Sequence, residues 1–165
     1  MTNHEPLHDP LQPHSHEPNP APPSPDSAFE ISLPGGREMR YSATMLRALP
    51  QTVLPDCYIV STGHGTSGPF AFGGPTLLVL VQDAVGTESG AAAWSQVEVI
   101  SADGFGTRVQ RAELEQPDGA GAIVAAVAVD GRPLTREEGL VRLIVPSERD
   151  DALRQVKWIG RINVR

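Results

Sequence analysis

The stretch CYIVSTGHGTSGPFAF, residues 57–72, decides how the rest of the chain is interpreted. Residues 58–60 form a short apolar run of β-favouring types. Small and polar residues follow it, with glycines interspersed and one imidazole, that of His64. Glycine lets the backbone take unusual dihedral angles, and loops at strand ends frequently carry binding groups. The stretch therefore predicts a strand that empties into a glycine-rich loop with a binding site.

The binding candidates in this loop are Ser61, Thr62, Gly63, His64, Gly65 and Thr66. His64 has two interpretations. It can point into a pocket as a hydrogen-bond donor to an anion or as a proton shuttle, because imidazole titrates near neutral pH, or it can pin the loop by bonding a backbone carbonyl. A hydrolase is disfavoured, since His64 lies close to Ser61 in sequence and no third member of a triad is recognisable.

Local patterns predict the elements before and after this stretch. Apolar alternation over 29–33, a Pro-Gly-Gly turn and a return over 39–41 indicate a β-hairpin. Ser42 is placed to cap a short helix over 43–49. A second, apolar helix is expected over 75–85, with Pro75 in its first turn and Gly86 at its end.

The C-terminal half is dominated by short strand patterns. We expect strands at 97–101, 108–111, 123–129, 140–145 and 156–164, with one helical turn at 112–116. In the last strand, Val156, Trp158, Ile162 and Val164 share one parity and so one face. Because strands outnumber short helices, the fold class is α+β, with a mixed, mainly antiparallel and partly rolled sheet.

The first 28 residues are rich in proline and histidine and contain no Lys or Arg. So little apolar surface cannot offset the entropy of ordering the chain, so we expect a disordered tail over 1–28 and one domain over 29–165. The closest histidines, His14 and His16, can chelate a transition metal weakly, but they lack the further ligands of a specific site.

Composition excludes several function classes. A net charge of −7 argues against nucleic acid or an anionic membrane as partner, because both need a cationic surface. A single cysteine, Cys57, excludes an internal disulfide and a thiolate-rich zinc site. The apolar run over 77–81 is too short to span a bilayer, and no basic leader precedes an apolar core, so we expect a cytoplasmic protein without membrane insertion.

Several motifs, in order, resemble a known family. They are LRALP (46–50), GHGTSGPFAFGG (63–74) before an apolar helix, SADGF (101–105), VDGRPL (129–134), GLVRLIVP (139–146) and VKWIGRINV (156–164). Their order and spacing over 40–165 resemble the molybdopterin-binding domain of sulfite oxidase-type oxidoreductases. The resemblance implies an α+β fold that holds a pyranopterin with molybdenum and that oxidises or reduces a small oxo-acceptor such as sulfite or a sulfoxide.

In enzymes of that family, a cysteine at the strand end, just ahead of the glycine-rich loop, supplies a thiolate to molybdenum. Here the equivalent stretch is VSTG (60–63), without sulfur. Cys57 lies four residues before Ser61, roughly 13 Å along an extended chain, which is too far for it to replace that ligand. We therefore assign no metal ligand, and we interpret Cys57 as a small buried hydrophobe.

The resemblance also implies candidates in the C-terminal half. Lys157 lies in the motif that is beside the cofactor in the family, and the phosphate of a pterin needs cationic groups and backbone donors. Arg108, Arg132 and Arg142 are further candidates from neighbouring strands, although such side chains usually form a solvated face. Asp103 and Gly104 are included in the cofactor-binding set, with a simple Asp-Gly turn as the alternative.

Three functions remain in competition, and whether the chain is an enzyme stays open. In one, the histidine-rich tail over 1–28 handles metal and the domain is its scaffold. The two others concern the domain itself. The first is a molybdopterin-binding redox protein, working with an electron-transfer partner that the sequence does not name. The second is a non-redox member that uses the pocket of the 63–68 loop to bind a small anionic ligand or another protein.

Overall fold

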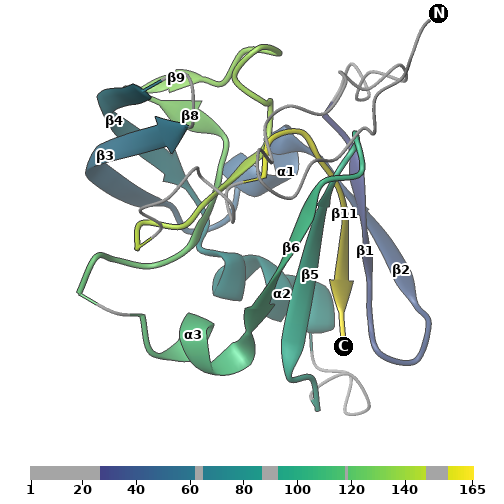
Figure 1. Ribbon diagram of the computed structural model, residues 1–165. Coiled ribbons are helices and arrows are strands. Elements are labelled where there is room, and N and C mark those ends of the chain that lie inside the picture. Colours follow the sequence, from purple (N-terminus) through teal and green to yellow (C-terminus); the bar gives the residue numbers. More distant parts are fainter. Residues whose placement is uncertain (1–26, 62–64, 87–92, 118, 148–155) are drawn as a thin grey trace, which may run out of the picture.

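The computed structural model describes residues 27–61, 65–86, 93–117, 119–147 and 156–165. The strands of these residues form two main sheets and one short pair, with small helices beside them (Figure 1). The larger sheet has the spatial order β2 (Glu38–Tyr41), β1 (Phe29–Ser32), β11 (Ile159–Val164), β5 (Gln96–Ser101) and β6 (Gly106–Gln110). The smaller sheet has the order β3 (Thr52–Ser61), β4 (Gly65–Gly74), β8 (Ala128–Val129) and β9 (Arg132–Pro133).

The larger sheet follows from local hairpins and one long-range pairing. β1 and β2 form the expected hairpin, and β5 and β6 form another across the turn at 101–106. β11 joins them, parallel to β1 and antiparallel to β5. Along β5, buried and partly exposed residues alternate, because successive side chains point to opposite faces. The expected mixed, mainly antiparallel sheet is confirmed.

A side-chain hydrogen bond caps the N-terminus of each of the first two helices. α1 (Ala43–Arg47) begins where the Ser42 hydroxyl accepts a hydrogen bond from the Met45 backbone N–H at 3.4 Å. α2 (Leu77–Val85) begins in the same way, with the Thr76 hydroxyl accepting from the Val79 N–H at 3.1 Å, and it ends at Gly86. Both expected helices are present, but α1 ends two residues earlier than expected and α2 begins two residues later, so Pro75 precedes the Thr76 cap instead of lying in the first turn. The short α3 (Arg111–Glu115) matches the expected helical turn.

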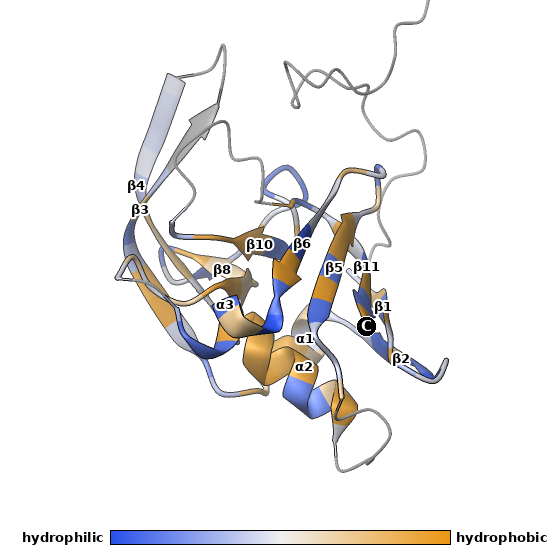
Figure 2. Ribbon diagram, turned by 60° about the horizontal axis from the view of Figure 1, so that its bottom comes forward, coloured by the Kyte–Doolittle hydropathy of each residue, from blue (hydrophilic) through white to orange (hydrophobic). Residues whose placement is uncertain are grey.

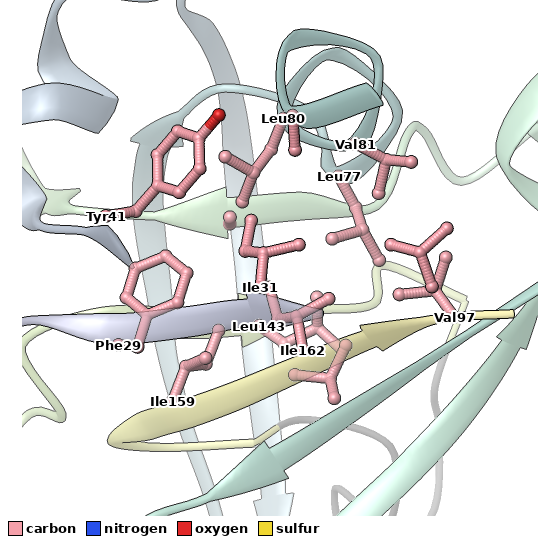
Figure 3. Packing of buried hydrophobic residues seen from close by; sticks show 14 of the residues in the cluster. Phe29, Ile31, Tyr41, Leu77, Leu80, Val81, Val97, Leu143, Ile159 and Ile162 are labelled. Carbon is pink, nitrogen blue, oxygen red and sulfur yellow. The ribbon is translucent and has the colours of Figure 1, made fainter. Parts of the chain in front are cut away.

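The main core lies between α2 and one face of the larger sheet. Leu77, Leu80 and Val81 of α2 point toward Ile31 and Ile162 of the sheet, and all five side chains are fully buried (Figure 3). Burying each such side chain contributes about 1.5–3 kcal/mol. At the edge of this core, the Tyr41 hydroxyl donates to Asp83 at 2.7 Å and so ties β2 to the polar side of α2.

A second, smaller core lies under the β3–β4 hairpin. It is formed by Leu54, Phe72, Val124, Ala126, Val129, Leu134 and Ile144. A strand pair, β7 (Val124–Ala126) and β10 (Arg142–Ile144), joins the two cores, because neighbouring residues Leu143 and Ile144 belong to the first and the second core respectively. The outer part of the hairpin extends away from the body of the molecule (Figure 2).

Three local predictions were wrong. Residues 65–74, expected as part of a loop, form strand β4, which pairs with β3. The single strand expected over 123–129 is divided between β7 and β8, which belong to different sheets. The last strand begins at Ile159 rather than residue 156, because Trp158 has a positive φ of 52° and cannot continue an extended strand.

Two further predictions concern the N-terminal tail and membrane insertion. The disordered tail expected over 1–28 lies almost wholly outside the described residues. In the described part of the chain, every helix is too short or too polar to cross a bilayer.

Candidate anion-binding site

The residues predicted for the glycine-rich loop lie on the β3–β4 hairpin. Ser61 pairs with Gly65 at the outer end of the two strands, and Thr66 pairs with Val60. Gly65 and Thr66 are exposed. Thr62, Gly63 and His64 lie outside the described residues, so both interpretations of His64 stay predictions. The hairpin belongs to the smaller sheet, whereas the turn with Asp103 and Gly104 joins two strands of the larger sheet and Lys157 shortly precedes β11 of that sheet.

Asp103 and Gly104 form the turn between β5 and β6. The Asp103 carboxylate accepts from the Phe105 N–H at 3.1 Å, and Gly104 takes a positive φ of 95°, so this is an Asx-type turn. The turn lies against the segment that carries Lys157, because the Ala102 N–H donates to the Trp158 carbonyl at 2.7 Å. The structure therefore brings Asp103 and Gly104 close to Lys157.

Lys157 is held against the turn formed by residues 135–140. Its ammonium donates to the Glu137 carbonyl at 3.1 Å and lies 5.8 Å from the centroid of the Trp158 ring. Gly139 lies directly beneath it, and a Cβ at Gly139 would come within 3.2 Å of the Lys157 Cβ. A side chain at position 139 would push against Lys157, and the φ of 113° there is one that residues other than glycine rarely adopt, so glycine is favoured.

Arg142, on β10, is the least satisfied cation among the described residues. Its Nε is buried and has no hydrogen-bond partner. Its guanidinium carbon lies 5.7 Å from the centroid of the Phe72 ring, so the side chain runs along the second core. Burial lowers the pKa of Arg142 to about 10, and the Glu138 carboxylate opposes that shift only in part. An unpaired buried N–H of this kind is costly and needs an acceptor.

Arg142 and Lys157 are electrostatic neighbours. Burial lowers the pKa of Lys157, and repulsion from Arg142 lowers it further. Two partly buried cations near one another repel, and an anion bound between them would offset that repulsion. The pair can therefore bind an anion, and the planar guanidinium suits the oxygens of a phosphate.

The other arginines predicted as candidates are already paired. Arg108 bonds Glu98 at 3.1 Å on the outer face of the larger sheet, and Arg132 forms a bidentate pair with Glu138. Arg142 differs from them, although the sequence offered all three arginines as equal candidates. The signal was available, because Arg142 stands alone among apolar residues in GLVRLIVP (139–146), where a solvated strand would alternate.

Cys57 lies in β3 opposite Phe70 and packs against the second core. Its thiol donates to the Leu54 carbonyl at 3.5 Å. Burial, and secondarily the charge of Asp56, raises the pKa of the thiol. A metal ion would have to displace this hydrogen bond and the thiol proton before the sulfur could bind it. Among the described residues, His, Cys, Asp and Glu side chains do not gather in a group of three or more that suits a metal ion.

The comparisons with known proteins identify the family to which this α+β domain belongs. The model of the oxidoreductase molybdopterin binding domain matches residues 16–165. The chain belongs to this family, as the resemblance of its motifs predicted. The match begins inside the expected tail.

A solved structure has the same fold. The sulfane dehydrogenase SoxCD from Paracoccus pantotrophus aligns with a TM-score of 0.63 and 17% sequence identity. The alignment covers 83% of this chain and 37% of that one, so this chain spans little more than a third of its length. The likeness supports the assigned fold. A search among curated proteins found no match.

Proposed function

We propose that this domain binds a phosphate-bearing pterin of the molybdopterin class, with Arg142 and Lys157 as the groups that hold its phosphate. The observation that carries the proposal is the buried Nε of Arg142, which has no hydrogen-bond partner among the described residues. Lys157 is a second cation close enough for the charge of Arg142 to lower its pKa. Family membership supplies the ligand class. Arg142 would donate two parallel N–H groups to phosphate oxygens, and Lys157 would add a point charge.

The predicted hairpin residues complete the proposed site. Ser61, Thr62, Gly63, His64, Gly65 and Thr66 stay candidates for the pterin end of the ligand. Asp103 and Gly104 stay candidates through the turn that lies next to Lys157. Phe72, whose ring lies beside Arg142 and whose strand carries Gly65 and Thr66, links the cationic pair to the hairpin.

Binding the pterin requires cations for its phosphate, whereas the metal in this family is bound by a cysteine thiolate. When bound, the cofactor of this family supplies oxidation or reduction of a small oxo-acceptor. The cationic pair fits the phosphate, but Cys57 does not fit the role of a thiolate ligand, because its side chain packs against the second core and its thiol donates to the Leu54 carbonyl. We therefore propose that this chain binds the pterin without a protein thiolate on the metal.

The state of Cys57 also favours a second candidate function, that of a non-redox member of the family. Such a protein would bind a small anion through Arg142 and Lys157, or a protein partner through the hairpin, without electron transfer. The two candidates make the same use of the cationic pair and differ in whether molybdenum is retained.

Cofactor analysis of the purified full chain tests the proposal. The protein is produced in a host that makes the molybdenum cofactor, and molybdenum is measured by elemental analysis while pterin is measured by fluorescence after oxidation. Wild type is compared with Arg142→Met and with Arg108→Met, which removes a paired surface arginine as a control. We expect pterin in wild type and in R108M, and its loss in R142M.

The outcomes separate the candidates. Near-stoichiometric molybdenum together with pterin supports a redox member. Molybdenum at trace level, with pyrophosphate binding that depends on Arg142, supports the non-redox member. Equal pterin in all three proteins would remove Arg142 from the site, and absence of both pterin and anion binding would overturn the proposal altogether.

A further inference from the structure

The turn over residues 135–140 is braced by one ion pair. The two Nη atoms of Arg132 donate to the two carboxylate oxygens of Glu138, at 2.8 and 2.6 Å. The same carboxylate accepts from the Thr135 N–H at 2.9 Å. These bonds, with that of Arg132 first, lower the pKa of Glu138 to about 2, so it is an anion at every physiological pH.

This turn is also the surface on which Lys157 and Trp158 rest. The Trp158 indole N–H donates to the Arg136 carbonyl, and the Lys157 ammonium donates to the Glu137 carbonyl. The Trp158 backbone N–H donates to the Gly139 carbonyl at 3.0 Å. Leu140, at the end of the turn, has a positive φ of 60°, which a leucine adopts only when its surroundings impose it.

Glu138 is therefore an anion placed next to a pair of cations to which it is not bonded. Its charge favours the protonated forms of both Arg142 and Lys157. Its carboxylate oxygens nevertheless bond Arg132, which lies on the exposed strand β9. If that pair were broken, the carboxylate would retain only the bonds to Thr135 and could pair with Arg142 or Lys157, the two cations on which its charge already acts.

We propose that Arg132 is a positioning residue: it holds the Glu138 carboxylate away from Arg142 and Lys157 and so keeps both cations available to an anionic ligand. Without Arg132, Glu138 acts as an internal competitor for the site. This inference rests on the proposed function, since it concerns the same anion site. It adds that the site is kept open by an ion pair that does not touch the ligand.

A double-mutant cycle on the full, cofactor-free chain tests this role, with pyrophosphate as the titrated probe and calorimetry as the readout. The variants are Arg132→Gln, Glu138→Gln and the two combined. We expect R132Q to weaken binding roughly threefold to tenfold, the effect of one partly exposed charge contact. We expect E138Q to bind at least as tightly as wild type, and the double variant to recover wild-type affinity.

Recovery of wild-type affinity in the double variant is the decisive result. If R132Q weakened binding only by loosening the turn, removing the Glu138 carboxylate as well would not restore the affinity. Unchanged affinity in R132Q, or a double variant as weak as R132Q, would overturn the positioning role while leaving the proposed function intact. Failure of wild type to bind pyrophosphate would overturn both. Arg132→Lys gives a further check: it keeps the charge but loses the bidentate geometry, so its affinity should lie between those of wild type and R132Q.

Discussion

Charged side chains are partnered in one region of this molecule, around Glu98, and left partly unpartnered in another, at Arg142 and Lys157. On the outer face of the larger sheet, the Glu98 carboxylate accepts from Asn163 at 3.2 Å, from Arg165 at 3.2 Å and from Arg108 at 3.1 Å. These bonds, with that of Asn163 first, lower the pKa of Glu98. Arg142 and Lys157, in contrast, lie side by side with a buried Nε that has no partner among the described residues.

The difference separates structural charges from charges kept for a ligand. Around Glu98, each charge has a partner on an adjacent strand, so the cluster needs nothing from outside. At Arg142 the carboxylate whose charge acts on the guanidinium, that of Glu138, is bonded to Arg132 instead. Retaining an unpaired buried charge destabilises a fold, and such strain is typical of functional sites. The contrast leads to graded predictions for the two regions.

The largest effect is expected at Arg142. Arg142→Met preserves much of the packing against Phe72 but removes the guanidinium. Pyrophosphate binding should weaken roughly tenfold to a hundredfold, because a hydrogen bond to a charged group is worth about 1.5–3 kcal/mol. Calorimetric titration measures this. The thermal midpoint of the ligand-free variant should not fall, and a large drop would show that Arg142 is a structural residue after all.

Lys157→Met should have a smaller effect of the same sign. We expect binding about tenfold weaker, since a point charge is lost but the fork of Arg142 remains. The ligand-free protein should become no less stable, because repulsion between the two cations disappears. Denaturant unfolding checks the second point: a variant that unfolds at lower denaturant than wild type would place Lys157 among the paired, structural charges.

Anion affinity should also depend on pH with a defined sign. The groups that face Lys157 are Arg142, which lowers its pKa, and Glu137 and Glu138, which raise it less than burial and Arg142 lower it. A bound anion favours the charged ammonium, so affinity should be full below the lowered pKa and should fall as the pH rises through it, below the ordinary 10.5. Sulfate is the suitable probe, because its charge is constant over this range. In Lys157→Met, the decrease in sulfate affinity at the lower end of this pH range should be missing. An identical pH profile in both proteins would exclude Lys157 from the anion site.

The smallest effect is expected at Glu98. Glu98→Gln should lower the free energy of unfolding by about 1 kcal/mol or less, as for other solvent-facing ion pairs, and should leave pyrophosphate affinity unchanged. Because the folded-state pKa of Glu98 is lowered, its contribution is present above the unfolded value of 4.5 and is lost as the pH falls through the folded value. Wild type should therefore lose more stability on acidification than E98Q. Equal losses would mean that this cluster contributes nothing to stability.

Elements built from local rules could be predicted from the sequence. The caps at Ser42 and Gly86 and the hairpin of β1 and β2 depend on neighbouring residues, so their patterns were sufficient. The glycine-rich stretch was misread as a loop over 65–74 because its strand character comes from pairing with β3, not from its own composition. Local propensity is overruled where a partner strand supplies the hydrogen bonds.

The site was less accessible to sequence reasoning. Lys157 entered the prediction through the family motif, and the structure places it beside the Asp103–Gly104 turn through the bond from Ala102 to Trp158. Arg142 was grouped with Arg108 and Arg132, because its apolar neighbours in GLVRLIVP (139–146) were not used to separate it and its burial beside Phe72, far away in sequence, is visible only in the fold. Whether an arginine pairs with a glutamate, as Arg132 does, or lacks a partner for a buried N–H among the described residues, as Arg142 does, is decided only in the folded chain.

The proton–nitrogen NMR signal of the Arg142 Nε–H, assigned by its disappearance in R142M, tests the central claim most directly. It is followed as pyrophosphate is added to the ligand-free protein, and the Arg108 Nε–H serves as the reference in the same spectra. The account predicts a saturable shift of the Arg142 signal as its N–H gains an acceptor, with the Arg108 signal unmoved. An Arg142 signal that stays in place, or two arginine signals that shift equally, would contradict it.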